Sequence, residues 1–124
     1  MSVFSSAELA HLAERRLGRL ATVDAAGLPH VVPRGRSFNP ATDTIDVTGR
    51  DFARTAKFRN AVANPLVALV ADDVRPQWRR RAVMVRGRAE ALVKAVDEDG
   101  RPGGQIPRIY PVRVTSWGLA RSAK

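Results

Sequence analysis

Residues 44–60 read TIDVTGRDFARTAKFRN, and the pair Asn64-Pro65 follows shortly after them. Apolar and polar residues alternate over Thr44–Thr48, which predicts a β-strand. Gly49 then permits a turn, and the next segment has the composition of a short helix near Asp51–Ala63. Asn64-Pro65 ends that helix, because proline cannot continue it. The segment therefore predicts a strand followed directly by a helix.

Three cations of this segment recur at helical spacing. Arg50, Arg54 and Lys57 are separated by four and three residues, so they lie on one helix face. Their mutual repulsion reverses in sign if a phosphate binds at the helix N-terminus, where free N–H groups favour an anion. The alternative is a solvated basic face on an arginine-rich protein. The spacing alone leaves both interpretations open.

Composition restricts the classes of function. The 124 residues carry a formal net charge of +9, and 18 of the 21 basic residues are arginine. Arginine suits bidentate contacts to phosphate or carboxylate. The charge also makes nucleic acid a candidate partner, but the basic residues are spread along the whole chain and form no basic arm. The absence of cysteine excludes disulfides, thiolate metal sites and cysteine nucleophiles.

Length and hydropathy indicate one domain, residues 1–124, with one modest core. A large cofactor would strain so small a core, so a site shared between two subunits is a natural solution. The N-terminus lacks a signal-peptide pattern, and the longest apolar run, Leu66–Ala71, is too short to span a bilayer. We expect a soluble cytoplasmic protein that has neither a membrane nor a nucleic acid as its partner.

The other segments predict a mainly β protein. A capping box, Ser5 with Glu8, begins a helix that Gly18 should end. Besides Thr44–Thr48, the expected strands are Arg19–Val23, Pro29–Phe38, Leu66–Ala71, Ala82–Val93 and one or two within Ile106–Leu119, and the expected loops are Asp72–Arg81 and Asp97–Gly104. Six strands arranged as hairpins, with two short helices, favour a small closed β-barrel over a parallel α/β sheet.

Two strands carry expectations about their faces. Leu66–Ala71 is uninterrupted in its apolar character, which indicates burial on both faces. In the last strand, Val112, Val114 and Ser116 should share one side because they are two residues apart.

The order and spacing of several segments resemble the split β-barrel flavin and deazaflavin oxidoreductases related to pyridoxamine 5′-phosphate oxidase. The branch most similar to this chain is the actinobacterial one that uses coenzyme F420. The resemblance runs from about Phe4 to Leu119, and no single motif in it is specific. The segments that carry it are Gly18–Val23, Gly27–Pro33, Asp43–Asp46, Lys57–Arg59, Asn64-Pro65, Trp78, Val85–Glu90 and Ser116–Gly118.

The resemblance implies a six-stranded split β-barrel that binds its cofactor between the two subunits of a homodimer. By position, strand ends should line the cofactor ring, the start of the inserted helix should bind phosphate, and one loop should approach from the partner chain. The implied cofactor-binding residues are Val31, Val32, Pro33, Arg34, Val47, Thr48, Gly49, Thr55, Ala56, Lys57, Trp78 and Arg81.

The same resemblance implies a reductase that passes hydride from the reduced deazaflavin to an electron-poor small molecule, such as an enone or a quinone. The cofactor supplies the chemistry, so neither a catalytic nucleophile nor a metal is expected. Tyr110 and His30 are the candidate proton donors. The anionic tail of coenzyme F420 suits Arg34, Arg36 and the cluster Arg79–Arg81.

Other functions remain open. The chain departs from its relatives in having Arg34–Ser37 after Val-Val-Pro, and Ala82 stands nearest the place of a ring-binding glutamine in the oxidase branch. One alternative is an oxidase of the pyridoxamine-phosphate type, or a flavin reductase, that uses flavin mononucleotide (FMN). A second is a non-catalytic barrel that binds a cofactor or nucleic acid.

Overall fold

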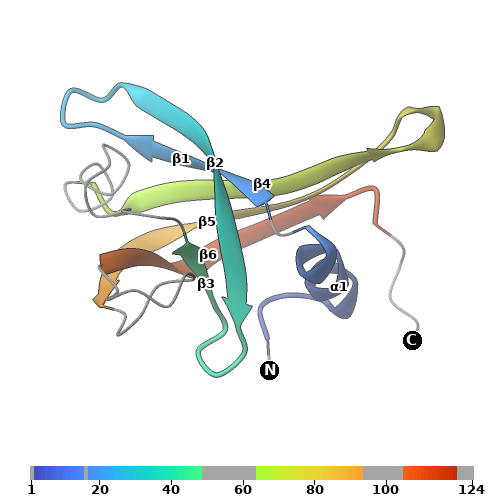
Figure 1. Ribbon diagram of the computed structural model, residues 1–124, viewed down its shortest axis with the longest axis horizontal. Helices are drawn as coiled ribbons and strands as arrows, with labels where there is room; N and C mark the ends of the chain where they lie inside the picture. Colours follow the sequence, from blue (N-terminus) through green and yellow to red (C-terminus); the bar gives the residue numbers. More distant parts are fainter. Residues whose placement is uncertain (1, 16, 49–63, 94–104, 120–124) are drawn as a thin grey trace.

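The computed structural model describes residues 2–15, 17–48, 64–93 and 105–119. Six antiparallel strands form a closed barrel in the order β1-β2-β3-β6-β5-β4 (Figure 1). The elements are α1 (Ser6–Glu14), β1 (Leu17–Val23), β2 (Pro29–Asn39), β3 (Thr44–Thr48), β4 (Leu66–Arg75), the 3-10 turn η2 (Pro76–Trp78), β5 (Arg79–Val93) and β6 (Gln105–Trp117).

This architecture confirms the mainly β barrel and the first of the two helices. The second expected helix, near residues 51–63, lies outside the described residues. In the part of the chain that the structure describes, no helix has the length and apolar character needed to cross a membrane.

The barrel core comes from the strand residues that alternate inward. Val83, Val85 and Gly87 of β5 are buried, whereas Arg86 and Arg88 between them are exposed, as the alternation predicts. Fully buried side chains from the other strands complete this core, among them Leu20, Ile45, Val47, Leu69 and Ile109. The barrel interior is therefore filled with apolar side chains.

Helix α1 packs against β2 and β5 near one end of the barrel. The predicted capping box is present: the Ser5 hydroxyl accepts from the Glu8 amide at 3.1 Å, and the Glu8 carboxylate accepts from the Ser5 amide at 2.8 Å. His11 is buried on the side facing the sheet, and its Nε2 donates to the Ala71 carbonyl at 2.9 Å. Together these contacts fix where the helix begins and which face it buries.

Gly18 does not end the helix, as the sequence had suggested. The helix ends at Glu14, and Gly18 lies within β1 with its face toward β4. A Cβ at Gly18 would lie 3.3 Å from Leu69 Cγ and from the Val70 carbonyl oxygen. Glycine is therefore explained here by a close approach between strands rather than by a helix cap.

The expected loop Asp72–Arg81 is instead the end of a long β-hairpin. β4 continues to Arg75, β5 begins at Arg79, and η2 forms the turn between them. Figure 1 shows this hairpin extending well beyond the barrel. The polar sequence suggested a loop, but an exposed two-stranded arm has little apolar surface to bury, so it lacks the alternation that marks a strand. We call residues 72–81 the arm.

Two expectations about strand faces are wrong. In β4, Val67, Leu69 and Ala71 are buried, but Leu66 is 57% exposed, so only one face of the strand is buried within one chain. In β6, Val112 is 74% exposed while Val114 packs against the core. A β-bulge accounts for the difference, because Val112 has no partner in the register between Pro111 and Arg113.

Candidate functional site

One cavity is an open groove on the barrel, at the end opposite the arm. Its volume is about 620 Å³. It runs across β1, β4, β5 and β6, and most of its lining is apolar; the lining includes Ala21, Leu66, Ala68, Arg86, Val112 and Arg113. A groove of this size and character can take a flat organic molecule.

A β-bulge shapes the groove. Arg86 pairs with Arg113 and Gly87 pairs with Pro111, so Val112 is an extra residue on β6. Val112 and its neighbour Arg113 both line the groove and are both exposed, although consecutive strand residues normally point to opposite faces. The bulge therefore leaves two adjacent residues on the outer side of the barrel, at the groove.

Gly87 makes this bulge possible. A Cβ at Gly87 would lie 2.2 Å from the Tyr110 carbonyl oxygen and 3.1 Å from the Pro111 Cα. These are backbone atoms, which cannot move aside without disturbing the strand pairing. Only glycine fits this close approach of β5 and β6.

The expected cofactor-binding residues of β2 do not line the groove, but their strand pairs with β1, which does. Val31 is 59% exposed and pairs with Ala21, which lines the groove. Val32 and Arg34, which alternate to the face of β2 opposite Val31, are half-buried. Burial lowers the pKa of Arg34 below its ordinary value. Pro33, in phase with Val31, is exposed.

The predicted residues of and after β3 divide into two groups. Val47 is fully buried in the core, so its side chain reaches no solvent in the single chain. Thr48 is the last residue of β3. Gly49, Thr55, Ala56 and Lys57 lie outside the described residues, so the expected phosphate site remains a prediction.

Trp78 and Arg81 lie far from the groove of their own chain. The groove contacts β4 at residues 66–68, whereas the arm begins at the far end of that strand. At about 3.3 Å per residue, the groove and the arm tip are roughly 25 Å apart. Trp78 is 84% exposed at this tip, and both Gln77 and Trp78 have left-handed backbone angles, with φ of 66° and 58°.

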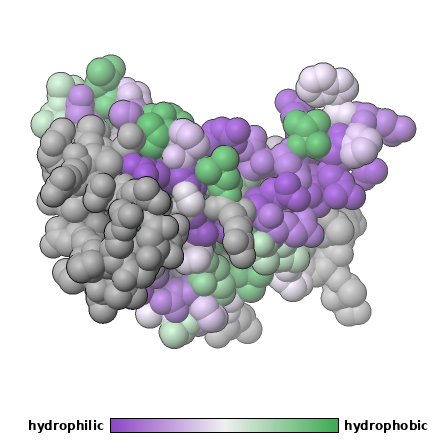
Figure 2. Space-filling view, viewed as in Figure 1, coloured by the Kyte–Doolittle hydropathy of each residue, from purple (hydrophilic) through white to green (hydrophobic). Residues whose placement is uncertain are grey.

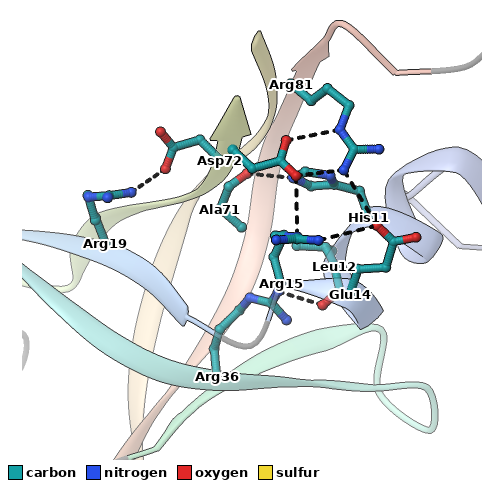
Figure 3. A network of polar contacts seen from close by, with 10 residues as sticks. His11, Leu12, Glu14, Arg15, Arg19, Arg36, Ala71, Asp72 and Arg81 are labelled. Carbon is teal, nitrogen blue, oxygen red and sulfur yellow. Dashed lines mark hydrogen bonds and ion pairs between the residues drawn. The ribbon is translucent and has the colours of Figure 1, made fainter. Parts of the chain in front are cut away.

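Arg81 belongs to a network that ties the arm to α1 (Figure 3). Its Nε and Nη2 donate to the two carboxylate oxygens of Asp73 at 2.9 and 2.6 Å, and Nη2 lies 3.5 Å from Glu14. The hydrogen bond from Arg81 lowers the pKa of Asp73 to about 2. Arg15 adds a second cation, with its Nε 3.4 Å from the same carboxylate.

Arg36 does not take the exposed position expected of a residue that binds an anionic tail. It is only 6% exposed, and its Nη2 donates to the Leu12 carbonyl near the end of α1. Burial lowers the pKa of Arg36 to about 10. The side chain therefore fastens α1 to β2.

The candidate proton donors lie in different places. Tyr110, 39% exposed, lines a smaller cavity of about 400 Å³ together with Arg88 and Glu90. His30 is half-buried on β2, opposite Thr22. Within residues 2–15, 17–48, 64–93 and 105–119, no three His, Asp or Glu side chains are grouped so that they could hold a metal ion.

Sequence reasoning did not single out Arg86 and Arg113 as site residues. Each is one exposed arginine in a strand, and only the register between β5 and β6 shows that they face each other. One signal was present: glycine inside a strand often marks a bulge or a close approach, and Gly87 follows Arg86 directly.

Comparison with known proteins agrees with the barrel. The family model described as pyridoxamine 5′-phosphate oxidase matches residues 5–106. A curated relative from Streptomyces rimosus is the 5a,11a-dehydrotetracycline/5a,11a-dehydrooxytetracycline reductase. The two sequences are 41% identical over 120 residues, which cover 94% of this chain and 84% of the relative.

Solved structures show the same fold at lower sequence identity. A conserved hypothetical protein of Mycobacterium tuberculosis has a TM-score of 0.72 at 22% identity, over 99% of this chain and 93% of the other. The FAD-binding protein of Mycobacterium smegmatis has a TM-score of 0.68 at 21% identity, over 94% and 96% of the two chains. An FAD-binding protein of Mesorhizobium loti has a TM-score of 0.68 at 23% identity, over 91% and 92%.

Proposed function

The chain belongs to the pyridoxamine 5′-phosphate oxidase family of oxidoreductases, and we propose that it is a reductase that uses the deazaflavin coenzyme F420. The observation that carries this proposal is the 41% identity, over 94% of the chain, to a reductase of dehydrotetracyclines. A relation of this extent supports a similar reaction class. The proposed substrate is a flat, conjugated enone or quinone.

The groove suits such chemistry. Its apolar wall, with Ala21, Leu66, Ala68 and Val112, can receive flat rings and keep water away from one of their faces. When bound, the reduced deazaflavin supplies a hydride to an electron-poor carbon, and a proton from solvent completes the reduction. The role of the protein is to hold the two molecules face to face.

We further propose that the working unit is a homodimer. Val31, Leu66 and Val112 are each more than half exposed in the single chain, and they lie at or beside the groove. Large apolar side chains gathered in this way are typical of a surface that a partner covers. The arm, roughly 25 Å away along β4, can reach a groove only in a second copy of the chain.

The cofactor phosphate is assigned to the segment with Thr55, Ala56 and Lys57, because the resemblance and the cation spacing both point there. Exposed Arg79 and Arg80 on the arm remain candidates for the acidic tail. Arg81, which is engaged by Asp73, is a weaker candidate than its two neighbours.

Turnover with two cofactors tests the function. The purified protein should oxidise reduced coenzyme F420 in the presence of a polycyclic enone, and reduced FMN should give little or no turnover. Calorimetric titration should show tighter binding of F420 than of FMN. The cofactor assignment fails if FMN co-purifies at full occupancy and F420 cannot displace it, and the FMN-dependent oxidase or flavin reductase then takes its place.

Lys57→Ala tests the phosphate site. A charge-assisted contact to phosphate contributes about 1.5–3 kcal/mol, so F420 affinity should fall about tenfold or more. The far-ultraviolet circular dichroism spectrum should stay unchanged. Unchanged affinity would remove Lys57 from the site.

A further inference from the structure

Two arginines face each other across neighbouring strands at the groove. Arg86 of β5 and Arg113 of β6 are direct partners in the register, and both residues line the cavity. Both are exposed, and neither has a hydrogen bond or an ion pair among the described residues. Like charges placed directly opposite each other destabilise a sheet.

Register alone does not make a site. Arg75 and Arg79 also face each other, at the tip of the arm, but they line neither of the two cavities described above. The groove pair differs because both arginines line a largely apolar cavity, and the β-bulge at Val112 lies directly beside Arg113. The close approach at Gly87 holds this arrangement in place.

Across the sheet, the two arginines continue a row of small and apolar residues. The register links Val31 to Ala21, Ala21 to Ala68, and Ala68 to Arg86. A flat ring lying on the two alanines would therefore extend one edge toward both guanidinium groups. An oxyanion at that edge would offset the repulsion between the two arginines and accept charge-assisted hydrogen bonds from their planar guanidinium groups.

We propose that Arg86 and Arg113 form a clamp for the oxyanion of a flat, largely apolar ligand, whose rings lie on Ala21 and Ala68. The oxyanion is a carboxylate or an enolate attached to the ring system. We assign this ligand as the substrate of the reductase. That assignment rests on the function proposed above, whereas the recognition of a flat oxyanion does not.

The first experiment needs no cofactor. Calorimetry would compare 2-naphthoate with its neutral counterpart 2-naphthamide, using the wild-type protein and the variants Arg86→Gln, Arg113→Gln and the double variant. Naphthoate should bind more tightly than naphthamide to the wild type. Loss of two charge-assisted contacts should weaken naphthoate binding about tenfold or more in the double variant and leave naphthamide binding unchanged.

Arg88→Gln is the matched control, because it removes the same charge from an exposed arginine of β5 that lines the smaller cavity and not the groove. It should leave naphthoate affinity unchanged. The proposal is overturned if naphthoate and naphthamide bind the wild type equally, or if Arg88→Gln weakens naphthoate binding as much as Arg113→Gln does. Circular dichroism would check that each variant is folded. Arg113→Lys keeps the positive charge but not the bidentate geometry of the guanidinium group, so it should retain only part of the naphthoate affinity.

The second experiment separates substrate from cofactor and from a second copy of the chain. If the clamp holds the substrate, Arg113→Gln should raise KM for an acidic enone about tenfold and leave F420 affinity and dimer mass unchanged. A loss of F420 affinity with unchanged KM would mean that the two arginines bind the cofactor. Conversion to a monomer with unchanged naphthoate affinity would mean that they stabilise the subunit interface. Either result overturns the proposal. If F420 supports no turnover but naphthoate binding still depends on the clamp, only the proposed function has failed.

Discussion

Arginines at the two ends of the β4–β5 hairpin differ in whether they have a carboxylate partner. Near the base of the arm, Arg81 meets both oxygens of Asp73, and α1 supplies Glu14 as a second carboxylate. At the groove, Arg86 and Arg113 face each other, and neither has a carboxylate partner among the described residues. Figure 2 shows hydrophilic residues over most of the hairpin and a mixture of hydrophobic and hydrophilic residues at the β1–β2 end.

This contrast separates structural arginines from candidate binding residues. A guanidinium already held by a carboxylate has little left to offer an incoming anion, whereas an unpaired one beside an apolar groove can gain from it. The residue type and the side-chain charge are the same for Arg81 and for the two groove arginines. They differ in whether a carboxylate is near, which only the fold reveals.

The test with the largest expected effect concerns an arginine–carboxylate pair between β3 and β6. Arg108 donates from Nε and Nη2 to Asp46 at 2.8 and 3.2 Å, and the two residues are direct partners between β6 and β3. Asp46 is only 7% exposed. Arg108→Met should therefore leave a buried carboxylate unpaired and lower the free energy of unfolding by about 3–5 kcal/mol.

Arg19→Met is the matched control, because Arg19 also pairs with a carboxylate, that of Asp72, but on the surface. An exposed pair contributes only about 0–1 kcal/mol. Urea denaturation would measure both variants. If both variants lose the same free energy of unfolding, burial of the carboxylate does not decide the strength of these pairs.

The second test concerns the backbone at the groove end. Gly87→Ala would place a methyl group 2.2 Å from the Tyr110 carbonyl oxygen, so β5 and β6 must separate. Overpacking of this kind costs about 3 kcal/mol. Naphthoate binding should also weaken, because the bulge would no longer aim Arg113.

Gly27→Ala provides the comparison for that variant. Gly27 has φ of +88°, and an added Cβ would meet nothing within 4 Å. Its cost is left-handed strain alone, about 1 kcal/mol. Equal unfolding midpoints in urea for the two variants would mean that the close approach of β5 and β6 does not hold the bulge.

The sequence predicts the barrel better than it predicts the site. The alternation in β5 and the capping box at Ser5 are local patterns, and the structure confirms both. The arm and the bulge depend instead on pairing between distant strands. Val112 was assigned to the wrong side because a single extra residue shifts every later side chain.

Site residues show the same limit. Arg36 and Arg81 have the charge expected of residues that bind an anion, yet α1 covers the first and Asp73 engages the second. Sequence spacing cannot show these contacts, since the partners lie 24 and 8 residues away. Arg86 and Arg113 were missed for the converse reason, because their value lies in having no carboxylate partner among the described residues.

The third test uses pH at the arm. Arg81 lowers the pKa of Asp73 to about 2, below its ordinary value of 3.8. The folded pKa is the lower one, so this pair stabilises the protein fully above the ordinary value and loses that effect as the pH falls from about 4 to about 2. In urea denaturation, Asp73→Asn should remove this part of the pH dependence. If the difference between wild type and variant is constant over that range, the Asp73 carboxylate does not titrate as assigned.

The smallest expected change in stability is at the arm tip, and it tests whether the exposed end has a function. Trp78 is 84% exposed with φ of 58°, a left-handed conformation that favours glycine. Trp78→Gly should therefore raise the free energy of unfolding by about 1 kcal/mol, because strain is relieved and little packing is lost. If the aromatic side chain reaches the groove of a second copy, F420 affinity should fall in the same variant, whereas Trp78→Phe should retain most of it. A variant that is more stable and binds F420 normally would show that Trp78 has no part in the site. A variant that is less stable would mean that the aromatic ring packs against the protein, contrary to its exposure in the structure.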